Sequence, residues 1–175
     1  MGKIAVGRVI IGGLVAGLII NISESVLHAF ILGPAWMDYQ KIHNFGGMTG
    51  GGSITMIVLL FILGLVAVWL YAAIRPRFGA GPKTAIYAGL VIWLLVSVMS
   101  NLGGLAVGVY TSSIAITMLL WTLVEMPLAT FVGAWIYREE EGAGAEVAAP
   151  EPAAPETAAP ETGGAEPAGE EKEGE

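Results

Sequence analysis

The longest stretch of this chain without a charged residue lies between Lys83 and Glu125, where 41 consecutive positions carry no Asp, Glu, Lys or Arg. As one continuous helix it would be about 60 Å long at roughly 1.5 Å per residue, about twice the thickness of a bilayer's hydrocarbon core. The stretch must therefore turn back once, and glycine, serine and threonine gather at residues 103–113. The sequence predicts two membrane-spanning helices here, joined by a turn in that segment.

Two further apolar segments, each long enough to span a bilayer, precede this stretch. The first ends at Gly33-Pro34 and the second at Arg75-Pro76, and both pairs are typical helix stops. A soluble helical bundle is the alternative, but it needs a charged face on every helix, and residues 54–74 carry no charge at all. The chain is therefore predicted to be an all-α integral membrane protein, a four-transmembrane-helix bundle. Its spans are expected at about 4–32, 54–74, 84–102 and 114–137.

The distribution of charge divides the chain into two parts. Residues 1–138 hold seven Lys and Arg against three acidic residues, whereas residues 139–175 hold twelve Glu and one Lys. The second part repeats Ala, Pro and Glu and has almost no large apolar side chain, so it cannot bury a core. We expect a transmembrane domain over 1–138 and a disordered, low-complexity, acidic C-terminal tail over 139–175. The tail is interpreted either as a solvating appendage or as a tether for a basic cytoplasmic partner, and no nucleic-acid partner is expected.

Basic residues mark one side of the predicted membrane. Six of the seven lie before the first span, between the second and third spans, or after the fourth: Lys3, Arg8, Arg75, Arg77, Lys83 and Arg138. Lys41 alone follows the first span, and none separates the third from the fourth. The positive-inside rule then places the N- and C-termini in the cytoplasm, in a multi-pass protein of the cell (plasma) membrane.

Four polar residues in the first predicted span recur at helical spacing. Because positions i, i+3, i+4 and i+7 share one face of a helix, they should form a single stripe, which two glycines extend. We expect this face to turn toward protein rather than lipid, and the glycines to allow close approach of a helix, including self-association with a second copy. The polar members are Asn21, Glu24, Ser25 and His28, and the glycines are Gly13 and Gly17.

Glu125 lies near the middle of the predicted fourth span, where a carboxylate costs about 2.5 to 3.5 kcal/mol on insertion scales. It should be neutral, paired or beside water. Two interpretations stay open: a hydrogen bond to a neighbouring helix that fixes their register, or a proton or cation site. Ser97 and Asn101 in the third span and Thr122 in the fourth add polar groups on the interior faces. We predict a polar cleft lined by spans one, three and four and opening outward, with span two mostly facing lipid.

A metal or haem site is the further alternative at this cleft. Glu24, His28 and Glu125 are its candidate ligands, but a third nitrogen ligand is missing and the chain has no cysteine. No catalytic motif is present either. We therefore predict no cofactor and no enzymatic activity.

The segment between the first two spans, residues 33–53, is the one long connection. Its first half is aromatic and polar and predicts a short interfacial helix. Its second half, residues 46–53, is glycine-rich and is expected to be a flexible connector, with a lid over the cleft as the alternative.

Two functional hypotheses follow from these features. The first is an accessory or structural subunit that associates with other membrane proteins, since glycine-rich helix faces suit helix association. The second is a small transporter or a proton- or cation-handling protein that uses the polar cleft around Glu125, Glu24 and His28. Four spans without an inverted repeat leave little room for alternating access, which favours the first hypothesis.

Overall fold

The computed structural model describes residues 4–44 and 49–142, with residues 138–142 described by their backbone. Over these residues the chain is all-helical, and four helices are long and apolar enough to cross a membrane: Val6–Ile31, Gly50–Phe78, Pro82–Ala106 and Ser112–Tyr137. The predicted all-α fold with four such helices is confirmed, and the protein is a multi-pass membrane protein. The predicted disorder of the acidic tail beyond residue 142, and its proposed basic partner, lie outside the described residues.

The first membrane helix is made of two parts, α1 (Val6–Val26) and the π-helical turn η1 (Leu27–Ile31). A short helix, α2 (Gly33–Ile42), follows directly with Pro34 in its first turn, where a missing backbone N–H costs nothing. This is the short helix predicted for the first half of the outer connection.

Helix α3 (Gly50–Phe78) begins earlier and ends later than its apolar pattern indicated. The Thr49 side chain accepts a hydrogen bond from the Gly52 backbone N–H at 3.1 Å, so residues 50–53, predicted to be flexible, form the first turn of a helix. At the other end the helix continues through Pro76 and stops at Gly79, whose φ of 86° suits glycine.

The third crossing consists of α4 (Pro82–Ile92), the π-helical turn η2 (Trp93–Val98) and α5 (Met99–Ala106). A tight turn at residues 107–111, with Gly108 at φ 73°, then leads into α6 (Ser112–Gly142). The predicted reversal of the long uncharged stretch therefore occurs within the predicted segment.

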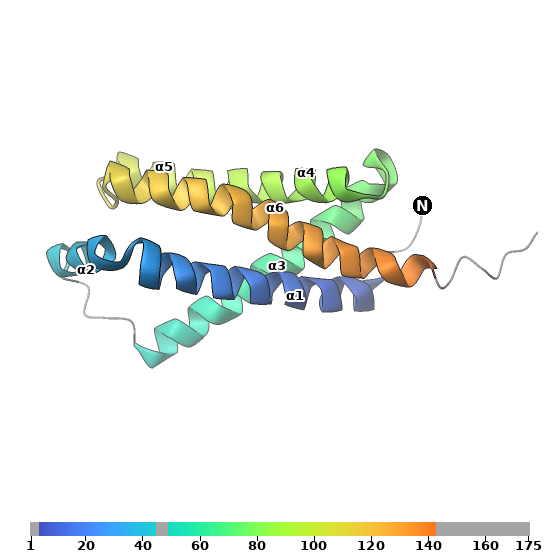
Figure 1. Ribbon diagram of the computed structural model, residues 1–175, viewed down its shortest axis with the longest axis horizontal. Coiled ribbons are helices and arrows are strands. Elements are labelled where there is room, and N and C mark those ends of the chain that lie inside the picture. The colour runs from blue at the N-terminus through green and yellow to red at the C-terminus, as the bar shows by residue number, and fades with distance from the viewer. Residues whose placement is uncertain (1–3, 45–48, 143–175) are drawn as a thin grey trace, which may run out of the picture.

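The two ends of the bundle differ in chemistry. One end carries the first turn of α1, the α3–α4 connection and the end of α6, and we call it the basic end after Arg8, Arg75, Arg77 and Lys83 (Figure 1). The opposite end carries α2 and the α5–α6 turn, and we call it the aromatic end after Trp36, Tyr39 and Tyr110. At the basic end the Arg75 guanidinium lies 5.9 Å from the centre of the Tyr137 ring.

Close helix contacts at small residues hold the basic half of the bundle together. Helix α1 packs against α3 and α6, and α4 packs against α6 and α3. The buried core between them is rich in alanine, with Ala16, Ala67, Ala88 and Ala129 fully covered. Within a membrane such contacts rest on van der Waals packing, which requires backbones to approach closely.

Three glycine contacts set the helix spacing. Gly64 of α3 lies directly against the backbone of Gly13 and Gly17 of α1, so that a Cβ at position 64 would collide with both. In the same way Gly12 of α1 meets Gly133 of α6, and Gly89 of α4 meets Pro127 of α6. The predicted close helix approach at Gly13 and Gly17 is therefore made by α3 of the same chain, and self-association through these glycines stays a prediction.

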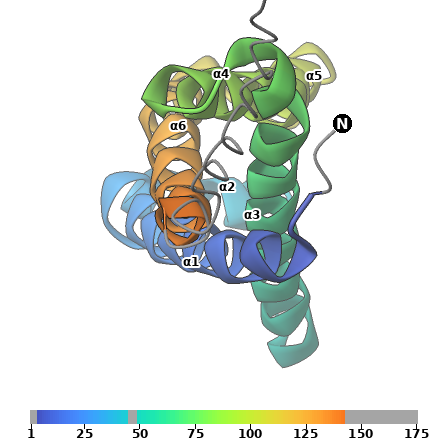
Figure 2. The same ribbon diagram turned by 90° about the vertical axis from the view of Figure 1, so that its right-hand side faces the viewer.

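The second span was predicted to face mostly lipid, but only the first half of α3 is exposed and the second half is buried. Residues 54–59 are exposed, whereas Gly64, Ala67, Val68, Tyr71 and Ala72 are buried in the bundle. The helix slants across the others, so its first turns project beyond them (Figures 1 and 2). Glycine at position 64 creates this contact, and a hydropathy pattern cannot detect it.

Candidate functional site

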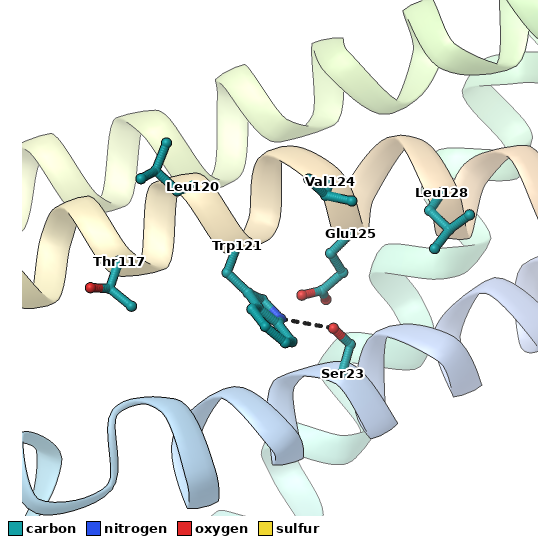
Figure 3. A pocket seen from close by; sticks show the side chains of 7 residues that line it. All are labelled: Ser23, Thr117, Leu120, Trp121, Val124, Glu125 and Leu128. Carbon is teal, nitrogen blue, oxygen red and sulfur yellow. Dashed lines mark hydrogen bonds between the residues drawn. The ribbon is translucent and has the colours of Figure 1, made fainter.

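Glu125 lies near the middle of the membrane-crossing part of α6 and is 4 % exposed. Neither of its carboxyl oxygens has a hydrogen-bond partner among the described residues. The carboxyl group points from α6 toward α1, into the space beside Ser23 and Trp121 (Figure 3). Burying a polar group without a hydrogen bond costs free energy, so this carboxyl group is the most conspicuous feature of the membrane-embedded part.

Two residues that sequence reasoning did not single out complete the surroundings of Glu125. The indole N–H of Trp121 donates to the Ser23 hydroxyl at 2.9 Å, which links α6 to α1 directly beside the carboxyl group (Figure 3). Because Ser23 accepts this bond, its own hydroxyl hydrogen remains available as a donor. The spacing of Trp121, one helical turn before Glu125, was a signal in the sequence that could have found it.

A pocket of about 510 Å³ opens beside this group. Six of its lining residues belong to α6 and one, Ser23, to α1: Ser23, Thr117, Leu120, Trp121, Val124, Glu125 and Leu128. Leu120, Val124 and Leu128 are 62 %, 67 % and 52 % exposed and follow one another at intervals of four residues. Because these three side chains line the pocket and are exposed, the pocket is open to the side along the outer surface of α6.

Glu24 and His28 pair with each other further toward the aromatic end. The Nδ1 atom of His28 lies 3.2 Å from the Glu24 carboxylate and 2.9 Å from the Glu24 backbone oxygen. His28 lies in the π-helical turn η1, and its ring also meets the Trp36 ring edge-on at 4.8 Å. Pi-helical turns inside α-helices are frequent at functional sites.

The proposed metal ligands do not form a metal site in the part of the chain that the structure describes. No group of three or more His, Asp or Glu side chains there is close enough to hold an ion, so Glu24, His28 and Glu125 are not joined in that way. The second histidine, His43, packs instead against Tyr39, with ring centres 4.5 Å apart.

Three further polar residues predicted for the cleft lie on η2, α5 and α6. Ser97, Asn101 and Thr122 are all buried. Asn101 donates to the Ser97 backbone oxygen at 2.8 Å, and Thr122 donates to the Met118 backbone oxygen at 2.7 Å, so these side chains mainly satisfy their own helices. The Asn101 side-chain oxygen has no partner among the described residues.

The pocket beside Glu125 is lined by α6 and α1 and takes no lining residue from the third crossing, so the predicted cleft of three helices stays a prediction. The polar stripe of α1 is divided between its neighbours. Asn21 donates to the Gly17 backbone oxygen at 2.8 Å and faces Ile57 of α3, whereas Ser25 is exposed and donates to the Asn21 backbone oxygen. A single helical face is about 100° wide, and α3 and α6, which both pack against α1, contact different parts of it.

An aromatic cluster closes the bundle beyond Glu24 and His28. The Tyr39 ring of α2 stacks on the Trp36 ring with their centres 5.2 Å apart. Its centre lies 5.8 Å from that of the Tyr110 ring in the α5–α6 turn. Burial raises the pKa of the Tyr110 hydroxyl, and the neighbouring Tyr39 raises it further, so Tyr110 stays uncharged. The cluster anchors α2 over the ends of η1 and α6.

No protein-family model, no curated protein and no solved structure matches this chain. The site must therefore be interpreted from its own geometry. That geometry is a buried carboxyl group without a partner, a hydroxyl and an indole fixed beside it, and a pocket that opens to the side. Such a site can bind a hydrogen-bond donor that arrives from within the membrane.

Proposed function

We propose that this protein is an accessory membrane subunit that associates with another membrane protein along the first half of α3. One observation carries the proposal. Residues 54–59 of α3 are six consecutive exposed positions, which amounts to more than one and a half helical turns, so every side of this segment has surface that the described chain leaves exposed. The one described hydrogen bond to this segment from another helix is donated by the Asn21 side chain to the Ile57 backbone oxygen, at 3.4 Å.

The slant of α3 supports an interface at this segment. A helix of 29 residues is about 44 Å long and exceeds the roughly 30 Å of a hydrocarbon core, so it must cross the membrane with a tilt. Tilt in membrane helices is set by packing against neighbouring helices, yet in this chain only the second half of α3 is held, by α1, α4 and α6. A helix of a partner protein would pack against the first half.

The basic residues support an orientation for this subunit. We propose that the basic end faces the cytoplasm, because Arg8, Arg75, Arg77 and Lys83 gather there. The exposed half of α3 then lies in the outer half of the membrane. The glycine contacts close the inner half of the bundle, which favours a packing role over the large rearrangements of a transporter.

A photo-crosslinking scan tests this proposal. Benzoylphenylalanine at Val58 is expected to give one discrete adduct with another membrane protein after irradiation of intact membranes from the native host. The control position is Leu95 in η2, which is comparably exposed at 60 % but lies on a different helix. Lipid adducts alone at Val58, or the same products at both positions, would contradict the proposed interface.

A specific arrangement favours a second candidate function, proton or cation handling at Glu125. The Glu24–His28 pair extends from the neighbourhood of Glu125 toward the aromatic end, and chains of such groups serve as proton relays in membrane proteins. Under this hypothesis, proteoliposomes with a membrane potential should show proton uptake that falls at least about tenfold in Glu125→Gln, which keeps the shape of the side chain but cannot ionise. Thr122→Val is the matched control on the same helix. Proton uptake no faster than in empty liposomes would exclude this candidate.

A further inference from the structure

The pocket between α1 and α6 has the size and the polarity of a site for a small lipid-soluble molecule. Its volume of about 510 Å³ lies within the roughly 300 to 1,000 Å³ typical of ligand pockets. Most of its lining is apolar. Polar atoms of Ser23, Trp121 and Glu125 lie together in it, and the Thr117 hydroxyl lies apart from them (Figure 3). This is the usual composition of a binding site, in which apolar walls supply contact area and a few polar groups orient the ligand.

The route into the pocket restricts the ligand to the lipid phase. Leu120, Val124 and Leu128 line the pocket and are all more than half exposed on the outer surface of α6. The six α6 residues of the lining extend from Thr117 to Leu128, which corresponds to about 16 Å along the helix. An elongated groove of this kind fits a hydrocarbon chain lying beside α6.

The depth of Glu125 restricts the headgroup. The residue lies near the middle of the membrane-crossing segment Ser112–Tyr137, where the surrounding lipid offers no water. The charged headgroup of a phospholipid would have to leave the membrane surface to reach it, at a high cost in free energy. The head of the ligand must therefore be small and weakly polar.

The unpartnered oxygens of Glu125 restrict the head further, to a hydrogen-bond donor. Both oxygens are buried and lack a partner among the described residues, whereas the Trp121 N–H is already used by Ser23. A hydroxyl group can donate to the carboxyl group and accept from the Ser23 hydroxyl at the same time. It fits a carboxyl group in either protonation state, because the ionised form accepts and the protonated form both donates and accepts.

We propose that this pocket binds a long-chain alcohol, with its hydroxyl group between Glu125 and Ser23 and its hydrocarbon chain along α6. The binding is independent of the α3 interface, which is formed by other residues on a different helix. The natural ligand belongs to the class of lipid-soluble, hydroxyl-bearing molecules with one hydrocarbon chain.

The test uses the full chain in phosphatidylcholine nanodiscs with fluorine-labelled tryptophan. Fluorine NMR follows the Trp121 signal, assigned with Trp121→Phe, while the other four tryptophans serve as internal controls. Adding 1-hexadecanol is expected to shift the Trp121 signal in a saturable way and to leave the others in place. Hexadecane, which has the same chain without the hydroxyl group, should produce no saturable shift.

Two variants locate the headgroup. Glu125→Leu should weaken 1-hexadecanol binding at least about tenfold, the effect of one hydrogen bond to a carboxyl group. Ser23→Ala should weaken it by a smaller factor and keeps the test decisive if Glu125→Leu does not fold. An equal response to hexadecane, no saturable response to the alcohol, or tighter binding of hexadecylamine than of the alcohol would each overturn the proposal. The last of these results would indicate a cation site instead.

Discussion

Replacing Gly64 by leucine is expected to separate α1 from α3 and to remove most of the folded protein from a detergent extract. A Cβ at this position meets the backbone of Gly13 and Gly17, which cannot move aside as the end of a flexible side chain can. Even Gly64→Ala should lower the free energy of unfolding by about 1 to 3 kcal/mol, the usual range for overpacking a tight contact. Leucine adds three more carbon atoms and should exceed that range. Steric trapping in bicelles measures the change.

The control for this substitution is Gly103 in α5. A Cβ there meets nothing within 4 Å, and the residue is exposed. Gly103→Ala and Gly103→Leu should therefore leave the free energy of unfolding unchanged within about 0.5 kcal/mol. Equal effects at Gly64 and Gly103 would mean that the α1–α3 contact does not hold the bundle together.

Replacing Glu125 by methionine is expected to stabilise the isolated protein while it abolishes binding at the pocket. Both carboxyl oxygens are buried without partners, and the neighbouring walls of the pocket are apolar. Exchanging such a group for an apolar side chain of similar length should raise the free energy of unfolding by about 1 to 3 kcal/mol. Steric trapping measures this gain, and fluorine NMR with 1-hexadecanol measures the loss of binding in the same preparation.

Thr122→Val on the same helix is the control for Glu125→Met. The Thr122 hydroxyl donates to the Met118 backbone oxygen at 2.7 Å, so its removal breaks a bond that the folded chain makes internally. We expect a slight loss of stability and unchanged binding, since such bonds contribute about 1 kcal/mol or less within membranes. If Glu125→Met instead lowered the stability of the isolated protein, the carboxyl group would have a structural partner, and its availability to a ligand would be disproved.

The polar residues of α1 show how far helical periodicity could predict the site. Glu24 and His28 are four residues apart, and helical spacing correctly indicates that they meet. Asn21 is also on the predicted stripe, yet it turns toward α3, because the face of one helix meets different neighbours at different depths. Spacing within a helix predicts which residues are adjacent on that helix and carries no information about the helix opposite.

Trp121 and Ser23 are the two residues beside Glu125 that were not predicted from the sequence. Neither residue was given a role in the sequence analysis. Their hydrogen bond joins residues 98 positions apart, and it exists only because α1 and α6 lie side by side. The long separation along the chain places this contact beyond any local pattern.

The sequence by itself determined the fold class, the four membrane-crossing helices and the turn in the long uncharged stretch. These follow from hydropathy, helix length and glycine or proline stops, which act within one segment and require no knowledge of its neighbours. The tertiary structure alone decided which helices pack together, that Gly64 fits against Gly13 and Gly17, and that Glu125 lines a pocket between α6 and α1. Apolar helices gain nothing from hiding apolar surface when the solvent is hydrocarbon, so their arrangement depends on contacts between small residues and on a few polar groups. Those contacts are formed between distant segments and become visible only when the helices are placed in space.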